Sequence, residues 1–480
     1  MAELSVSPLS IVNQIKANLE DRYATGYPIL KELVQNADDA RARRLRLDAR
    51  SGWLEADNPL LREPGLLVVN DGEFRPKDRR GILSFGESVK TADDAAIGKF
   101  GFGQKAVFHL CDAFIVHAYD ENEHEPFREV VNPFLNVEAP GSVAGHWDAL
   151  SDSDVTILRH AVSDEFHARA FVVWLPFRSA SLQPAPGLAF STHLPSVRQT
   201  VDELAQTEDL QALLTILRHL ESIEIRRQQG PEAAPATHCA VRVTDTATRL
   251  RGPVVDDENA DDVGRDPGHG NATGAADVAA RGGGKNYRAH NFGGTIGTGR
   301  KQPATFFGRE VTNPNIRLTT LKRSTHWPTA PSVFDPQPKP EKGEPHAAAA
   351  LLRTAGSDLR PDELTISWAV FLPVFDDQKI PLAIPPTPSR TGPSANATGP
   401  SRFSLLLHGY FFIDSGRRDI EGIREPVAID TPSNPGELRR AWNAEIRDAG
   451  VLPLVPLVLR DALDSGVATF DELERLVATI

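Results

Sequence analysis

The sequence has little cysteine and no long hydrophobic run. Only Cys111 and Cys239 are cysteines, and no CxxC pair occurs, which indicates a reducing compartment and offers no cysteine framework for a disulfide or zinc scaffold. No signal-like hydrophobic segment is found, nor an apolar run of about 18 residues that would predict a membrane helix. We therefore expect a soluble cytoplasmic protein without a membrane partner.

Positive charge is also in deficit. The chain carries 52 Lys and Arg against 65 Asp and Glu, giving a net charge of −13 and a pI near 5.6. This balance argues against nucleic acid or anionic lipid as a bulk surface ligand, while a local basic patch stays open. Arg exceeds Lys, and Ala and Asp are abundant, which is typical of a GC-rich bacterial source.

The length of 480 residues predicts two domains. Helical periodicity marks residues 8–20 and 28–42, and strand patterns follow at 45–50, 66–70, 113–119, 155–160 and 170–177. A helical stretch at 201–220 leads into a strand at 223–227. Helices followed by a mixed sheet predict an α+β fold, with a first domain over 1–220.

The second domain is expected over 221–480. Residues 252–305 are rich in Gly, Asp and Asn, and residues 326–348 are rich in Pro, so we expect long loops at 252–305 and 326–360. Order returns at 364–375 and 403–414, and a helical tail begins at 436. This pattern predicts a second α/β domain interrupted by loops.

The stretch KELVQNADDA, residues 31–40, places three polar residues on one helix face. Glu32, Asn36 and Asp39 are spaced by four and three residues, while Leu33 and Val34 fall elsewhere on the helix. A solvated stripe on an amphipathic helix has the same pattern. Two stretches further along favour a ligand site instead.

The first of these is LLVVNDGEF (66–74), a buried strand ending in Asn-Asp-Gly, and the second is IGKFGFGQKAVFHL (97–110). Glycines ahead of a helix let backbone amides approach an anion closely. The second stretch has neither P-loop spacing nor a surrounding βαβ unit, which excludes both common phosphate fingerprints. His109 and Cys111 lie in apolar sequence without other ligands nearby and are expected in the core.

In this order and spacing, the three stretches resemble the GHKL ATPases, which include gyrase, the ninety-kilodalton heat-shock chaperone, histidine kinases and MutL. The similarity is strongest to the sacsin and chaperone type: ELVQNADDA resembles the first motif, and 84–109 resembles a lid followed by a phosphate-binding box. The resemblance implies a two-layer α/β sandwich of the Bergerat type, with helices on a mixed, mostly antiparallel sheet. It also implies that ATP and Mg²⁺ bind and that ATP is hydrolysed.

The resemblance also implies residue roles. Glu32 would activate the attacking water, Asn36 would ligate Mg²⁺, and Asp39 would support the pocket. Asp71 would accept from the adenine amine, with Asn70 as the competing alignment, and Gly72 would leave space beside the base. The implied nucleotide-binding set is Asn36, Asp39, Ala40, Asn70, Asp71, Gly72, Ser88, Lys90, Gly98, Lys99, Phe100, Gly101, Phe102, Gly103, Gln104 and Lys105.

The resemblance continues in AFVVWLPFR (170–178), LLTILRHLESIEI (213–225), LHGYFFIDSGRR (407–418) and AWNAEI (441–446). It departs from sacsin at Gln104-Lys105-Ala106, where Phe-Asn-Ser is usual, and at Arg169-Ala170, read as the position of a Gly-Thr pair. Arg417 and Arg418 are the candidates to contact the γ-phosphate from the second domain, with Lys322 and Arg390 as rivals.

Three functions stay open. The first is an ATPase that couples nucleotide binding to closure of the lid and the second domain. The second is a poorly hydrolysing regulator or scaffold of a bacterial stress or antiphage system, and the third is a DNA clamp of the MutL or gyrase type, which the acidic charge disfavours. A histidine kinase would need an upstream helical hairpin, which residues before 8 do not supply. A protein client and a homodimer are open possibilities.

Overall fold

The structure, a computed structural model, describes residues 7–21, 27–75, 78–79, 82, 103–121, 126–139, 141–162, 166–185, 187–244, 246–251, 288–298, 303–312, 314, 345–355, 363–370, 372–373, 378–381, 401–413, 419–424 and 435–479. It divides into two compact units. Unit 1 comprises Met1–Thr244 with Ile296–Lys301, and unit 2 comprises Asp245–Thr295 with Gln302–Ile480. The fold is α+β, with mixed sheet and helices in each unit.

The sheet of unit 1 has the order β7-β6-β1-β2-β5-β3-β4, and the last residues of β8 pair with β7. Strand β6 runs parallel to β1, and the other neighbours are antiparallel. The strands are β1 (Arg44–Arg50), β2 (Gly65–Asn70), β3 (Phe114–Asp120), β4 (Phe127–Val131), β5 (Arg169–Pro176), β6 (Ser222–Arg227) and β7 (Ala236–Val243).

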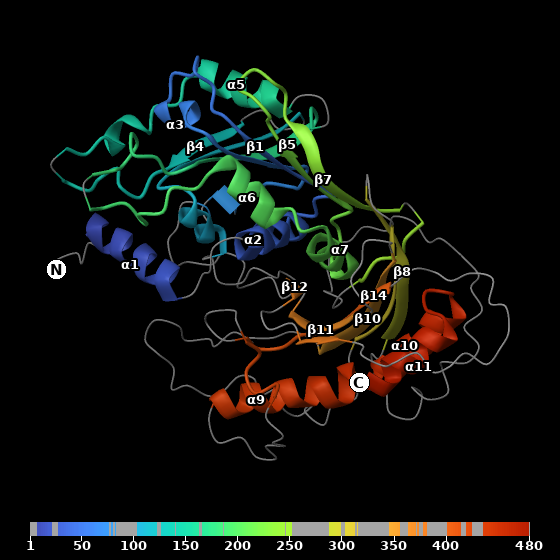
Figure 1. Ribbon diagram of the computed structural model, residues 1–480. Coiled ribbons are helices and arrows are strands. Elements are labelled where there is room, and N and C mark those ends of the chain that lie inside the picture. Colours follow the sequence, from blue (N-terminus) through green and yellow to red (C-terminus); the bar gives the residue numbers. More distant parts are fainter. Residues whose placement is uncertain are drawn as a thin grey trace. The chain divides into compact units, whose positions relative to one another are not determined.

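The alternation of strand residues gives this sheet two different faces. On β1, Leu45 and Leu47 are buried toward one face, while Arg46 and Asp48 are buried toward the other. Helices α1 (Pro8–Asp21), α2 (Tyr27–Asp39), α6 (Val197–Leu204) and α7 (Thr207–Ile216) lie on one side of the sheet, and α3 (Pro59–Arg62) and α5 (Asp152–Val162) lie on the other (Figure 1). Arg46 belongs to the α5 face, because its guanidinium donates to Ala161 O at 2.9 Å.

The stretch 155–160, expected as a strand, is part of helix α5, so that prediction was wrong. Its β-branched residues suggested a strand, but the start of the helix is capped reciprocally: Ser151 N donates to Asp154 Oδ2 at 3.0 Å, and Asp154 N donates to Ser151 Oγ at 3.1 Å. The buried residues Val155, Leu158 and Val162 follow helical spacing. Capping and the 3.6-residue period therefore outweigh β propensity here.

The helix expected at 201–220 is two helices, α6 and α7, separated at Ala205 and Gln206. The strand expected at 223–227 is β6, which pairs with β1. Because β6 and then β7 extend the sheet of unit 1, this unit continues to Thr244, past the expected end at 220. The expected helices at 8–20 and 28–42 are confirmed as α1 and α2, although α2 ends at Asp39, before the expected end.

Unit 2 has the strand order β12-β11-β14-β10-β9-β8, with β13 pairing β11. The strands are β8 (Arg288–Thr298), β9 (Ala304–Thr312), β10 (His346–Ala355), β11 (Glu363–Val370), β12 (Leu372–Pro373), β13 (Gln378–Pro381) and β14 (Ser401–Gly409). The helices of this unit are α9 (Pro435–Glu445), α10 (Leu454–Asp464) and α11 (Phe470–Thr479), with the π-helical segment η6 (Ile446–Val451) (Figure 1). They share a hydrophobic core with strands β9, β10, β11 and β14.

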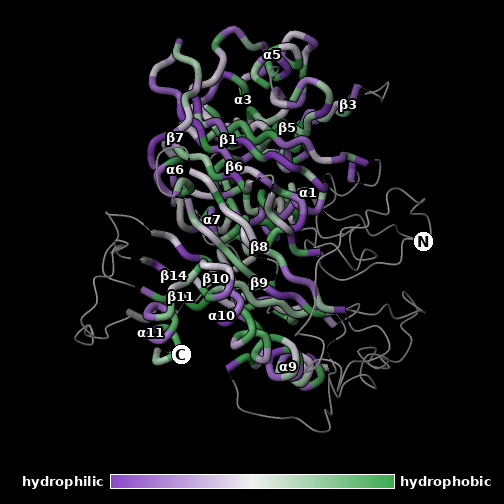
Figure 2. Tube along the Cα trace, turned by 90° about the vertical axis from the view of Figure 1, so that its right-hand side faces the viewer, coloured by the Kyte–Doolittle hydropathy of each residue, from purple (hydrophilic) through white to green (hydrophobic). Residues whose placement is uncertain are grey.

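Strands β8 and β10 lie inside stretches that we expected to be loops, which corrects that part of the prediction. Strand β8 is rich in glycine because neighbouring atoms come close: a Cβ on Gly294 would lie 2.4 Å from Ala247 Cβ. Strand β10, HAAAALLRTA, has no period of two, yet it is paired on both sides, by β9 and β14 (Figure 2 shows its hydrophobic run in green). Pairing on both edges stabilises it in spite of its alanines.

A buried chain of hydrogen bonds joins four strands of unit 2, β11, β14, β10 and β9. The Nδ1–H of His408 donates to Ala369 O at 3.2 Å, so its Nε2 accepts from His346 Nδ1 at 3.2 Å. His346 Nε2 then lies 2.9 Å from Glu310 Oε2, and Glu310 Oε1 accepts from Arg251 N at 2.8 Å. The chain therefore links these strands through buried polar side chains.

Candidate functional site

The first candidate motif forms helix α2, which packs against the sheet with Leu30, Val34 and Ala37 fully buried. Glu32 is 9% exposed and Asn36 is partly exposed, and the two lie one turn apart. Lys31 precedes Glu32 and is partly exposed as well. The helix therefore presents the predicted acid and amide next to each other while its apolar residues hold it to the unit.

The end of strand β2 meets the end of helix α2. Glu73 N donates to Ala40 O at 2.8 Å, and a Cβ built on Gly72 would lie 2.7 Å from Ala40 Cβ and 2.9 Å from Ala40 O. Any larger residue at position 72 would push the strand end and the helix apart. The structure thus brings together the first two motifs at Ala40 and Gly72.

Asn70 and Asp71 have different surroundings. Asn70 is 5% exposed. It lies opposite Leu45 of β1 and Phe171 of β5, so its side chain is on the face of the sheet on which α2 packs. Its Oδ1 accepts from Gly72 N at 3.0 Å. Asp71 follows the strand, and its carboxylate is engaged by three donors: Arg43 N at 2.8 Å, Arg44 N at 2.9 Å and Arg44 Nε at 3.0 Å.

The register also places Phe171, not Ala170, opposite Asn70. Phe171 packs against Phe74, with ring centroids 5.2 Å apart, and Phe74 packs against Phe127 at 5.1 Å. Arg169 pairs with Asp120 instead of facing Asn70. The strand end beside Asn70 is therefore aromatic.

Asp38 is a structural residue that sequence reasoning missed. Its side chain is fully buried and accepts from His219 N at 2.7 Å and Leu220 N at 2.9 Å. Neighbouring Asp39 lies 3.5 Å from an Arg218 nitrogen. The signal was available in the sequence, because Asp38 continues the apolar stripe of Leu30 and Val34 at spacing four, where a carboxylate must find partners.

The glycine-rich stretch leads into η2, a 3-10 helix over Gly103–His109 that contacts both α2 and α1. The backbone of Gly103, Gln104 and Lys105 forms its first turn. Cys111 belongs to the packed interior, as expected, whereas His109 is only half-buried. The Cys111 Sγ donates to Val107 O at 3.4 Å, and burial raises the pKa of its thiol. Among the described residues, no group of His, Cys, Asp and Glu could hold a metal ion.

Several predicted site residues lie outside the described residues. They are Ser88, Lys90, Gly98, Lys99, Phe100, Gly101 and Phe102 in unit 1, with the expected lid at 84–97, and Lys322, Arg390, Arg417 and Arg418 in unit 2. Their assigned roles stay predictions. Along the ranges that the structure describes, no helix is long and apolar enough to cross a membrane.

A cavity of about 190 Å³ adjoins the end of β2 in unit 1. It is lined by Gly72, Glu73, Phe74, Arg75, Arg79, Ala118, Tyr119, Asp120, Arg169 and Ala170. Two ion pairs join lining residues to each other, Arg75 to Glu73 and Arg169 to Asp120. Sites for drug-sized ligands usually enclose about 300–1,000 Å³, so this cavity alone is small for a nucleotide.

Comparison with known proteins bears on the same region. Residues 9–120 match the family model of the Sacsin domain, a range that includes α2, the end of β2 and η2. This part of the chain is sacsin-like. Human sacsin is 34% identical over 139 residues, which cover 28% of this chain and 3% of sacsin. The Arabidopsis thaliana protein NO VEIN is 31% identical over 104 residues, which cover 21% of this chain and 3% of NO VEIN.

Proposed function

We propose that unit 1 binds ATP with Mg²⁺ and hydrolyses it, as a GHKL-type domain in which the sheet and the helices on its α2 face form the two layers of the Bergerat arrangement. The observation that carries the proposal is the junction of α2 and β2, where Ala40 and Gly72 approach so closely that no side chain fits between them. Helix η2, which follows the glycine-rich stretch, contacts the same helix α2. Helix α2, the end of β2 and helix η2, which are separate in sequence, are thus brought together around α2.

Glu32 and Asn36 divide the chemistry between them. Phosphoryl transfer to water needs a positioned water molecule and a hard cation on the phosphate oxygens. The Glu32 carboxylate would orient the water and accept its proton, and the Asn36 amide oxygen would ligate Mg²⁺. Their separation of one helical turn lets both groups reach the terminal phosphate region together.

We assign the adenine contact to Asn70 instead of Asp71. The Asp71 carboxylate already accepts from two backbone amides and the Arg44 side chain, whereas Asn70 is buried on the face toward α2. An Asn amide has both a donor and an acceptor, which match the amine and ring nitrogen of adenine. Its Oδ1, which accepts from Gly72 N, retains a second lone pair for the amine.

Closure completes the proposed cycle. Residues 84–97 would cover the nucleotide as a lid, and Arg417 or Arg418 would bring positive charge to the γ-phosphate from unit 2. These steps rest on the family resemblance. The conformational change would then be passed to a protein client or partner.

The test measures ATP binding by calorimetry and phosphate release for the wild type, Glu32→Ala and Glu203→Ala. Glu203 is an exposed acid on α6 and serves as the matched control. We expect Glu32→Ala to bind ATP but to turn over about 10²- to 10⁴-fold more slowly, with Glu203→Ala unchanged. Wild type that does not bind ATP refutes the proposal, and binding without turnover reduces it to a nucleotide-binding regulator.

A further inference from the structure

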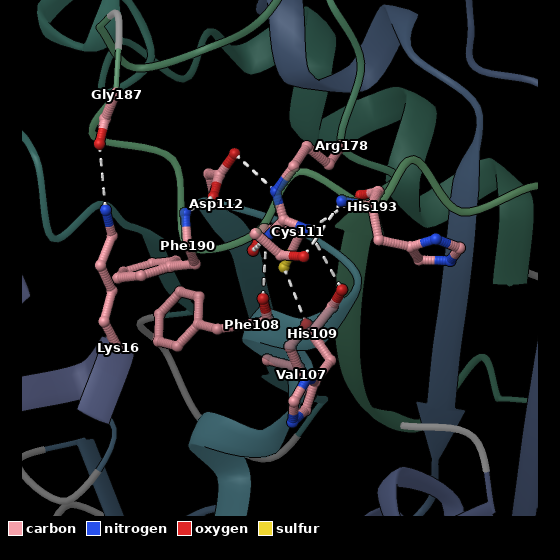
Figure 3. Close-up of polar contacts among 11 residues, drawn as sticks. Lys16, Val107, Phe108, His109, Cys111, Asp112, Arg178, Gly187, Phe190 and His193 are labelled. Carbon is pink, nitrogen blue, oxygen red and sulfur yellow. Dashed lines mark hydrogen bonds and ion pairs between the residues drawn. The ribbon is translucent and has the colours of Figure 1, made fainter. Parts of the chain in front are cut away.

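Arg178 lies just past strand β5 with its side chain completely buried. Its backbone N–H donates to Leu110 O at 2.8 Å. Its guanidinium donates five hydrogen bonds, shown in Figure 3: to Asp112 Oδ2 at 3.0 Å and to the carbonyl oxygens of Phe108 at 2.8 Å, His109 at 3.1 Å, Cys111 at 3.0 Å and His193 at 3.3 Å.

Most of these acceptors are at one end of helix η2. Carbonyl groups in the last turn of a helix have no partner within the helix, and the carbonyls of residues 108–111 all accept from Arg178. A planar fork with five N–H groups suits several acceptors at once, which a Lys ammonium on a flexible stem does not. Arg178 thus holds the end of η2 to the end of β5.

Asp112 balances this charge and extends the contact. Its Oδ1 accepts from Phe190 N at 2.9 Å, while its Oδ2 accepts from Arg178. Lys16 of α1 donates to Gly187 O at 3.1 Å, in the same segment as Phe190 (Figure 3). The segment 187–193, helix η2 and strand β5 are therefore fixed to one another around a buried, neutral ion pair.

We propose that Arg178 is a positioning residue for the nucleotide site. The inference rests on the proposed function, because η2 begins at Gly103, the last glycine of the stretch 97–110, and contacts α2, which carries Glu32 and Asn36. By fixing the far end of η2, Arg178 sets where its first turn lies relative to α2. A displacement of about 1 Å at such a site is enough to cost about 10²-fold in rate.

The experiment compares Arg178→Lys with Arg46→Lys in the full chain. Arg46 is a matched control, because it is buried, contacts Asp48 at 3.3 Å and donates to Ala161 O at 2.9 Å, but lies on the α5 face of the sheet. Both variants are expected to lose stability. Arg178→Lys should also bind ATP at least about tenfold more weakly and turn over more slowly, while Arg46→Lys should keep its affinity within about twofold.

Hydrogen exchange without nucleotide provides the second measurement. Amides of residues 106–111 should exchange faster in Arg178→Lys than in the wild type, and Arg46→Lys should leave them unchanged. If Arg178→Lys does not fold, Arg178→Ala is assayed with and without millimolar guanidinium, with sodium as the control ion. Restored ATP affinity with guanidinium alone supports the proposal, and no restoration overturns it.

The outcomes separate this inference from the proposed function. Equal losses of ATP affinity in Arg178→Lys and Arg46→Lys indicate general destabilisation and overturn the positioning role, while ATP binding by the wild type leaves the proposed function standing. Wild type without ATP binding refutes the proposed function. In that case the hydrogen-exchange rates of the amides of residues 106–111 alone test whether Arg178 positions η2. Equal rates in Arg178→Lys and Arg46→Lys would exclude this role.

Discussion

His117 on strand β3 should make the folded state of unit 1 sensitive to acid. The ring is fully buried, its Nδ1–H donates to Phe127 O at 3.1 Å, and its Nε2 accepts from Arg159 Nε at 3.2 Å. Protonation would place a second N–H against the Arg159 guanidinium. Burial, with a smaller contribution from the nearby Arg159 charge, lowers the pKa of His117 to about 4, although the bond to Phe127 O opposes this change.

The sign and size of the effect follow from linkage. In the unfolded chain the pKa of His117 is near 6.5. Between pH 6.5 and about 4, His117 is therefore protonated in the unfolded state and neutral in the folded state. The stabilisation is complete above pH 6.5, falls as the pH falls, and is exhausted below about 4. At about 1.4 kcal/mol per pH unit, the gap corresponds to about 3 kcal/mol.

The assay is urea unfolding at several pH values between 7 and 4.5 for the wild type and His117→Asn, whose amide can still donate to Phe127 O but does not titrate. His167→Asn replaces an exposed histidine and is the control. The wild type should lose more stability than His117→Asn across this range, and the control should follow the wild type. An NMR titration that places the pKa of His117 near 6.5 would refute the reasoning, as would parallel pH profiles.

Two further predictions concern the ends of β2 and α2. Asn70→Ala should weaken ATP binding by about tenfold or more, because a paired amide–adenine contact contributes about 1–3 kcal/mol, whereas Asp71→Asn should stay within about twofold, since its amide oxygen still accepts from Arg43 N and Arg44 N. Calorimetry showing the reverse order would return the adenine contact to Asp71. Asp38→Asn should destabilise unit 1 by roughly 2–4 kcal/mol in chemical unfolding, because an amide that keeps its oxygen toward His219 N and Leu220 N turns its N–H₂ toward Arg218 N and the Arg218 side chain in a buried site. Surface Asp202→Asn should change stability by less than about 0.5 kcal/mol, and equal effects would contradict the buried role of Asp38.

Most elements of unit 1 were predictable because their apolar residues follow one period. Strand β2 is continuously apolar and is buried on both faces, and α2 has a clear helical stripe. Helix α5 was not predictable from its β-branched residues, because the reciprocal cap of Ser151 and Asp154 decides its form. In unit 2, strand β10 depends on two neighbouring strands that lie far from it in sequence.

Residue type and spacing predicted that Glu32 and Asn36 lie one turn apart on a helix, and this placement is confirmed, while their roles stay predictions. The different surroundings of Asn70 and Asp71 could not be predicted, because they depend on which face of the sheet each residue occupies and on donors from Arg43 and Arg44. Arg178 was also missed. A single Arg after an apolar strand has no local sequence signal, and its acceptors come from segments far along the chain.

The hydrogen-bonded chain of Glu310, His346 and His408 limits how unit 2 can change by mutation. Replacing His346 alone with an apolar residue would remove its bonds to Glu310 and to His408 Nε2 at once, in a region where both partners are buried. Replacing all three with apolar residues of similar volume removes the chain without leaving a buried charge. The three positions, on strands β9, β10 and β14, are therefore expected to change together in evolution. Substituting one of them alone destabilises unit 2 until the other two are also substituted.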